Sequence, residues 1–222
     1  MSLPPAVATR LGEALSALHR HPQRTLLPWY RHAIYTALSA PALVGGLRVR
    51  AWLEIATVQH ILFCWQPRAW VTSWPQPHHL VALAEQALVG ATDRAHVGAH
   101  LNRAQALADV VGEPDTSAEY CTWCVFEAAL RTLHSAYQYD QWRALNVAAP
   151  CSIDATGCMD DASMYAAIAV GGGTWSPGVA SAYGEGAIVG RWEWQTPEAQ
   201  LRRAVFWEWW LREAIPSAWR RA

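Results

Sequence analysis

Residues 196–219, which read TPEAQLRRAVFWEWWLREAIPSAW, decide much of the fold because they place a cluster of aromatic side chains on one helix. Thr196 is a good N-cap, and Pro197 suits the first helical turn, where its missing N–H costs nothing. Pro216 restricts the residue before it and therefore predicts that the helix ends at Ile215. We predict one helix between these prolines.

Apolar and charged residues are distributed unusually around this helix. At about 100° per residue, one arc is apolar and consists of Leu201, Ala204, Val205, Trp207, Leu211, Ala214 and Ile215. Glu208 falls inside that arc. The sequence therefore predicts that Trp207 and Glu208 face inward and that an arginine satisfies Glu208. Arg212, one turn away, is the arginine at suitable spacing.

The opposite side of the same helix carries the remaining aromatic residues among charges, namely Phe206, Trp209 and Trp210 with Arg202, Arg203 and Glu213. Aromatic side chains on a nominally solvated face are either covered by another segment or contact a partner. We favour packing of these aromatics beneath the glycine-rich segment at 140–195, and contact with a partner is the alternative.

Composition restricts the class of protein. The chain has 222 residues, of which 52% are hydrophobic and 16% charged, and this is enough for one large core. A net charge of −1 argues against a nucleic-acid-binding protein. The N-terminus does not resemble a secretory signal, and no apolar run is long enough to span a membrane. We expect a cytoplasmic protein with a single all-α domain over residues 1–222.

Helical spacing recurs along most of the chain, and no useful length alternates with period two. It predicts helices at about 6–20, 28–39, 47–65, 79–89, 93–111, 117–139 and 162–170. The last of these is capped by Asp160 or Asp161 and ended by Gly171–Gly173. The predicted fold is an all-α, single-domain irregular helical bundle with a glycine-rich irregular segment at about 140–195.

Cysteine and histidine motifs offer little evidence of a metal site. Cys121 and Cys124 lie within a helical pattern, and Cys151 and Cys158 are more widely spaced, so buried reduced thiols are the favoured interpretation. Asp93, His96 and His100 share a helix face and could hold a metal, but a solvated polar face is favoured. We expect no metal and no cofactor.

Carboxylates on apolar faces raise the possibility of acid–base chemistry. Glu208 and Glu127 are the candidates, since a buried glutamate with a raised pKa can act as a general acid or base. An enzyme or small-ligand binder with a cleft near these residues is therefore an alternative hypothesis. The favoured interpretation is structural, with each carboxylate paired to an arginine.

Two segments together resemble a known family. DDASMYAAIAVGGG (160–173) and RRAVFWEWWLREAIPSAW (202–219) are similar to all-α bacterial immunity proteins grouped as immunity family five. The resemblance is carried by Asp161, Gly171–Gly172 and Phe206–Trp209, followed by Leu211, Glu213, Ala214 and Pro216. It implies a protein that neutralises a cognate toxin of a polymorphic toxin system, and no catalytic residue is carried over.

The resemblance leads to a prediction of toxin-binding residues. Residues 140–170 contain four aspartates and one arginine, a local charge of −3, although the chain as a whole is nearly neutral. We predict an interface with an acidic rim and aromatic anchors, formed by Asp140, Asp154, Asp160, Asp161, Trp209 and Trp210. The identity of the toxin and the oligomeric state are open, and a His-based metal-binding protein is the third hypothesis.

Overall fold

The computed structural model describes residues 2–39, 43–66, 74–111, 117–145, 161–172, 174–176, 191–193 and 196–222. Its elements, in order, are α1 (Pro5–Arg20), α2 (Pro28–Ser39), α3 (Leu43–Ile61), the 3-10 turn η1 (Leu62–Cys64), α4 (Pro77–Val89), α5 (Arg94–Val111), α6 (Ser117–Leu145), α7 (Ala162–Gly171), β1 (Thr174–Ser176), β2 (Arg191–Glu193), α8 (Pro197–Trp209), the π-helical turn η3 (Trp210–Ala214) and α9 (Ile215–Arg221). The predicted all-α class is confirmed.

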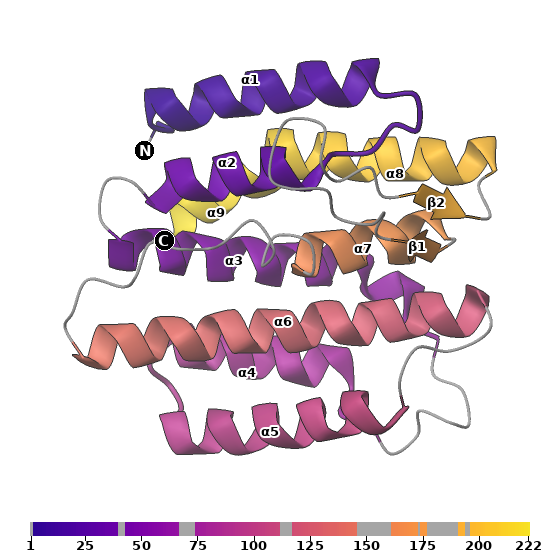
Figure 1. Ribbon diagram of the computed structural model, residues 1–222. Helices are drawn as coiled ribbons and strands as arrows, with labels where there is room; N and C mark the ends of the chain where they lie inside the picture. Colours follow the sequence, from indigo (N-terminus) through magenta and orange to yellow (C-terminus); the bar gives the residue numbers. More distant parts are fainter. Residues whose placement is uncertain are drawn as a thin grey trace.

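The helices pack in layers around α3 and α6 (Figure 1). Helix α6 contacts α3, α4, α5 and α7, while α3 also contacts α2, α7 and α9. Helices α1 and α5 form the two outer edges of the assembly (Figure 1). The chain ends lie near one another, because the Trp219 indole N–H donates to the carbonyl of Ser2 at 3.1 Å.

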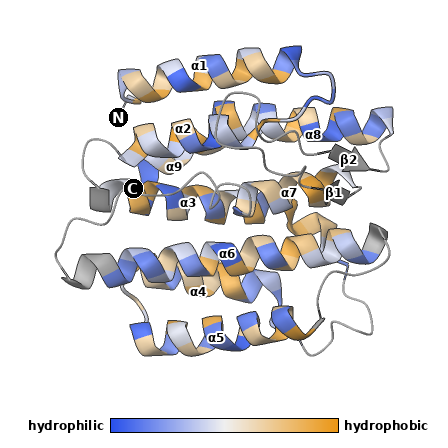
Figure 2. Cartoon of the chain, in the orientation of Figure 1, coloured by the Kyte–Doolittle hydropathy of each residue, from blue (hydrophilic) through white to orange (hydrophobic). Residues whose placement is uncertain are grey.

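Among the described residues, nearly all of the buried apolar side chains belong to one contiguous cluster. Helix α3 is apolar around most of its circumference and buries Val49, Trp52, Leu53, Ile55 and Val58. Short α7 is strongly hydrophobic along its length, whereas α1 and α5 alternate between polar and apolar faces (Figure 2). Among the described helices, none is long and apolar enough to cross a membrane.

Side-chain caps begin three of the described helices, and the sequence predicts those at Asp161 and Thr196. Asp93 accepts a hydrogen bond from the His96 amide at 2.8 Å, and Asp161 accepts one from the Met164 amide at 2.8 Å. Thr196 accepts from the Ala199 amide at 3.2 Å. These bonds satisfy amides that the helix itself leaves without a partner, so short polar residues mark these helix starts.

Pro216 does not end the C-terminal helix, and this prediction was wrong. The chain widens into the π-helical turn η3, in which the Ile215 amide donates to the carbonyl of Trp210, and then continues as α9. Ile215 keeps α-helical backbone angles. The wider turn accommodates a proline that has no amide to donate, so the helical path extends to Arg221.

Two further differences from the prediction concern local connections. Helix α3 begins at Leu43 and includes Gly45 and Gly46, although 40–46 read as a connection. A Cβ at Gly46 would collide with the backbone of Ser39, so glycine permits the close approach of α2 and α3. The antiparallel ribbon of β1 and β2, with Trp175 opposite Trp192, lies inside the segment predicted to be irregular.

Candidate functional site

Helix α8 turns a different face inward from the predicted one. Ala199, Arg203, Phe206 and Trp207 are buried in α8, whereas two members of the predicted apolar arc, Leu201 and Val205, are 65% and 60% exposed. The predicted inward positions of Trp207, Leu211, Ala214 and Ile215 are confirmed. Burying Phe206 and Trp210 removes more apolar area from water than burying Leu201 and Val205, and this difference favours the observed rotation.

Glu208 does not face inward, and this prediction was wrong. Its side chain is 42% exposed, and its Oε1 lies 2.7 Å from Nε2 of His19 at the end of α1. Arg212 is exposed on the next turn. An ion pair open to solvent contributes little stability. Glu208 therefore connects α8 to α1 at the surface instead of anchoring the core.

Trp210 is an interior residue. Its indole N–H donates to the hydroxyl of Thr57 at 3.1 Å, and its ring lies edge-on to Tyr35 at 6.1 Å and to Trp207 at 5.7 Å. Trp209 instead stacks on the ring of His60, with 3.6 Å between centroids. The described contacts of these two tryptophans are with α2, α3 and α8 itself. Since Trp210 is fully buried, its side chain is not available at the surface for a toxin.

Asp161 belongs to a buried ion pair. Its Oδ2 lies 3.1 Å from Nε of Arg31, and neither side chain has any exposed surface. Arg31 also donates to the carbonyl of Leu26 and lies 5.6 Å from the ring of Trp207. The predicted acidic patch therefore does not include Asp161 at the surface. Asp140 is half-buried on α6, and Asp154 and Asp160 lie outside the described residues.

A second buried pair lies on α3. The Arg50 guanidinium donates to Glu54 at 2.7 Å, and Arg50 also lies 4.9 Å from the ring of Tyr35. Burial raises the pKa of the Glu54 carboxyl, while Arg50 and a hydrogen bond from Ser135 oppose that shift. Glu127 is also buried and contacts Arg131 at 3.4 Å, so the predicted arginine pairing holds at this glutamate.

The remaining candidate motifs have structural explanations. Cys124 is fully buried and Cys121 half-buried, as predicted for reduced thiols, while Cys151 and Cys158 lie outside the described residues. Burial raises the pKa of the Cys121 thiol. Asp93 already accepts a hydrogen bond as the N-cap of α5. Among the residues that the structure describes, no group of three or more His, Cys, Asp or Glu is arranged to hold a metal ion.

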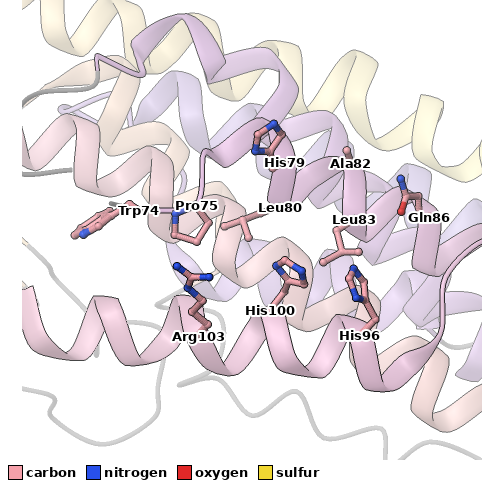
Figure 3. A pocket seen from close by; sticks show the side chains of 10 residues that line it. All are labelled: Trp74, Pro75, His79, Leu80, Ala82, Leu83, Gln86, His96, His100 and Arg103. Carbon is pink, nitrogen blue, oxygen red and sulfur yellow. The ribbon is translucent and has the colours of Figure 1, made fainter. Parts of the chain in front are cut away.

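A pocket of about 420 Å³ opens between α4 and α5 (Figure 3). It is lined by Trp74, Pro75, His79, Leu80, Ala82, Leu83, Gln86, His96, His100 and Arg103. Sequence reasoning singled out His96 and His100 but only as metal ligands, and it missed Arg103 on the same face of α5. A second pocket lies beside Arg10, Glu13, Arg20 and Trp29. Neither pocket is lined by Glu208 or Glu127.

The protein is all-α, and most of the carboxylates singled out from the sequence already take part in ion pairs or helix caps. The family model described as Immunity protein Imm5 matches residues 12–217, almost the whole chain. The chain therefore belongs to the Imm5 family of immunity proteins, as the resemblance in its C-terminal segments indicates. A search of curated proteins found no match.

Proposed function

We propose that this chain neutralises a cognate bacterial toxin by forming a one-to-one complex that covers the toxin's functional surface. Membership of the immunity family over residues 12–217 is the observation that carries the proposal. The positions of Glu208 and Glu127 also support binding over catalysis. Glu208 is half exposed in a pair with His19, Glu127 is buried beside Arg131, and neither carboxylate lines the two pockets described above.

A cytoplasmic location is part of the same proposal, because the protein must meet a toxin that enters or is made in the cell. Of the predicted toxin-binding residues, Asp140 and Trp209 are half-buried and keep some surface, so they stay candidates for contact. Asp161 and Trp210 are omitted because their side chains are buried.

Titration of the toxin's activity with the purified protein tests the stoichiometric mechanism. The toxin domain encoded by the neighbouring gene is held at a fixed concentration well above the dissociation constant, and its residual activity is measured as the protein is added. We expect a linear loss of activity that ends at one equivalent. Complete loss at a small fraction of an equivalent would indicate enzymatic modification of the toxin and contradict occlusion.

Co-expression tests the immunity role itself. Cells that produce the toxin domain should survive when this chain is produced with it, and an unrelated helical protein of similar size serves as the control. Cell death despite abundant soluble protein would overturn the proposed function.

A further inference from the structure

The pocket between α4 and α5 combines an apolar floor with a rim of nitrogen-bearing side chains. Leu80 and Leu83 extend from α4 toward α5, while His96, His100 and Arg103 extend from α5 toward α4 (Figure 3). Positions 96, 100 and 103 lie on one face of a helix because they are separated by four and three residues. This face of α5 is directed at another helix, where apolar residues would ordinarily be expected.

The pocket is lined by basic side chains and by no acidic ones. Its ten lining residues include one arginine and three histidines but no carboxylate. The two acids that flank this face along the chain are both engaged: Asp93 caps α5 at the His96 amide, and Asp109 accepts a hydrogen bond from the Gln105 side chain. Arg103 is exposed and forms no ion pair within the part of the chain that the structure describes. A guanidinium with no acidic neighbour in the pocket is available to a carboxylate supplied by another molecule.

We propose that this pocket is the docking site for an acidic segment of the toxin, with a carboxylate side chain bound by Arg103 and His100. This inference rests on the proposed function. An apolar side chain beside that carboxylate would cover the exposed parts of Pro75 and Ala82, so the segment combines an acidic and an apolar side chain. The arrangement matches interfaces in which an arginine and a desolvated apolar centre supply most of the affinity.

Protein carboxylates fit this site better than nucleic-acid phosphates do. A phosphate backbone would leave the exposed apolar atoms of Pro75 and Ala82 without a partner. Nucleic-acid binding also depends on neutralising several phosphates, and the chain as a whole carries a net charge of −1.

Affinity for the toxin domain, measured by calorimetry with purified proteins, tests the site. Arg103→Gln should weaken binding by about 10- to 100-fold, since a charge-assisted hydrogen bond is lost. His100→Asn should weaken it in the same direction. Arg94→Gln is the matched control, because Arg94 is an exposed arginine of α5 that does not line the pocket. It should change affinity by less than about 2-fold, as expected for a distant exposed charge.

Each other outcome has a definite meaning. Equal losses of affinity for Arg103→Gln and Arg94→Gln would show that the effect comes from the overall charge of the protein. This result would overturn the pocket assignment. A loss for Trp209→Ala with none for Arg103→Gln would place the toxin on α8 and also overturn it. Failure of the unaltered chain to bind or neutralise the toxin would instead overturn the proposed function.

Phenylacetate is a small molecule with an apolar ring and one carboxylate. Titration with it distinguishes a pocket that binds small free acids from one that binds a segment of the toxin. Binding of phenylacetate that requires Arg103, together with unchanged toxin affinity in Arg103→Gln, would assign the pocket to small acids and overturn the inference. Competition between phenylacetate and the toxin domain would support it.

Discussion

At the scale of single residues, the ion pair of Arg31 and Asp161 joins α2 to the start of α7 with both side chains fully buried. Removing one charge from such a pair leaves the other buried with less of the interaction that offsets its desolvation. Asp161→Asn keeps a side-chain oxygen that can cap α7 at the Met164 amide but removes the charge that faces Arg31. We expect this variant to lower the free energy of unfolding by about 3 kcal/mol or more.

Urea unfolding of a double-mutant cycle measures this expectation. The variant Arg31→Met, Asp161→Asn removes both charges, so its loss should be smaller than the sum of the two single losses. Additive losses would contradict a direct coupling between the two residues. Because both side chains are buried, salt should change the coupling much less than it would at the surface.

The sequence predicts correctly the roles of residues that contact near neighbours in the chain. It fails where a side chain contacts a distant segment. The caps at Asp161 and Thr196 follow from neighbours within three residues, and the sequence predicted both, although it left Asp160 as an alternative to Asp161. The partner of Glu208 is His19, 189 residues away, so helical spacing could only suggest Arg212. The pairing of Asp161 with Arg31, 130 residues away, could not be predicted for the same reason.

At the scale of elements, the contact between the end of α2 and the start of α3 depends on Gly46. A methyl group there would meet the backbone of Ser39, so the two helices would have to separate. We expect Gly46→Ala to destabilise the fold by about 1 to 3 kcal/mol, the usual cost of overpacking. The neighbouring Gly45 has nothing within 4 Å of its Cβ position.

Gly45→Ala is therefore the matched control for the helix contact. Both substitutions replace glycine by alanine inside α3, and alanine at an unobstructed helical position should stabilise the protein by about 0.5 to 1 kcal/mol. Thermal unfolding should thus show opposite shifts for the two variants. Stabilisation by both substitutions would mean that helix propensity, and not the contact with Ser39, controls this junction.

The C-terminal helix shows why the rotation of an element is harder to predict than its existence. Thr196 and Pro197 mark its start correctly, yet the calculated apolar arc placed Leu201 and Val205 inward. The observed face is chosen by the larger aromatic residues and by Arg203, which packs against Gly171 of α7. Counting each apolar residue equally ignores such differences in buried area.

At the scale of the whole molecule, elements from both ends of the chain share one core. Trp210 in the C-terminal segment donates to Thr57 of α3, and Trp219 of α9 donates to the carbonyl of Ser2. Helix α6 packs on α3, α4, α5 and α7. These contacts favour the prediction of one domain, in which no group of helices has a core of its own to unfold separately.

Unfolding therefore should proceed in one transition. Tryptophan fluorescence and far-ultraviolet circular dichroism should give the same midpoint in urea, because a single core couples tertiary packing to helix content. Thr57→Val should move both curves together, with a loss of about 1 to 3 kcal/mol because the buried indole N–H of Trp210 is left without an acceptor. Separate midpoints, or a fluorescence curve that moves alone in Thr57→Val, would indicate two cores. A shared shift would establish that α3 and the C-terminal helix belong to one cooperative unit.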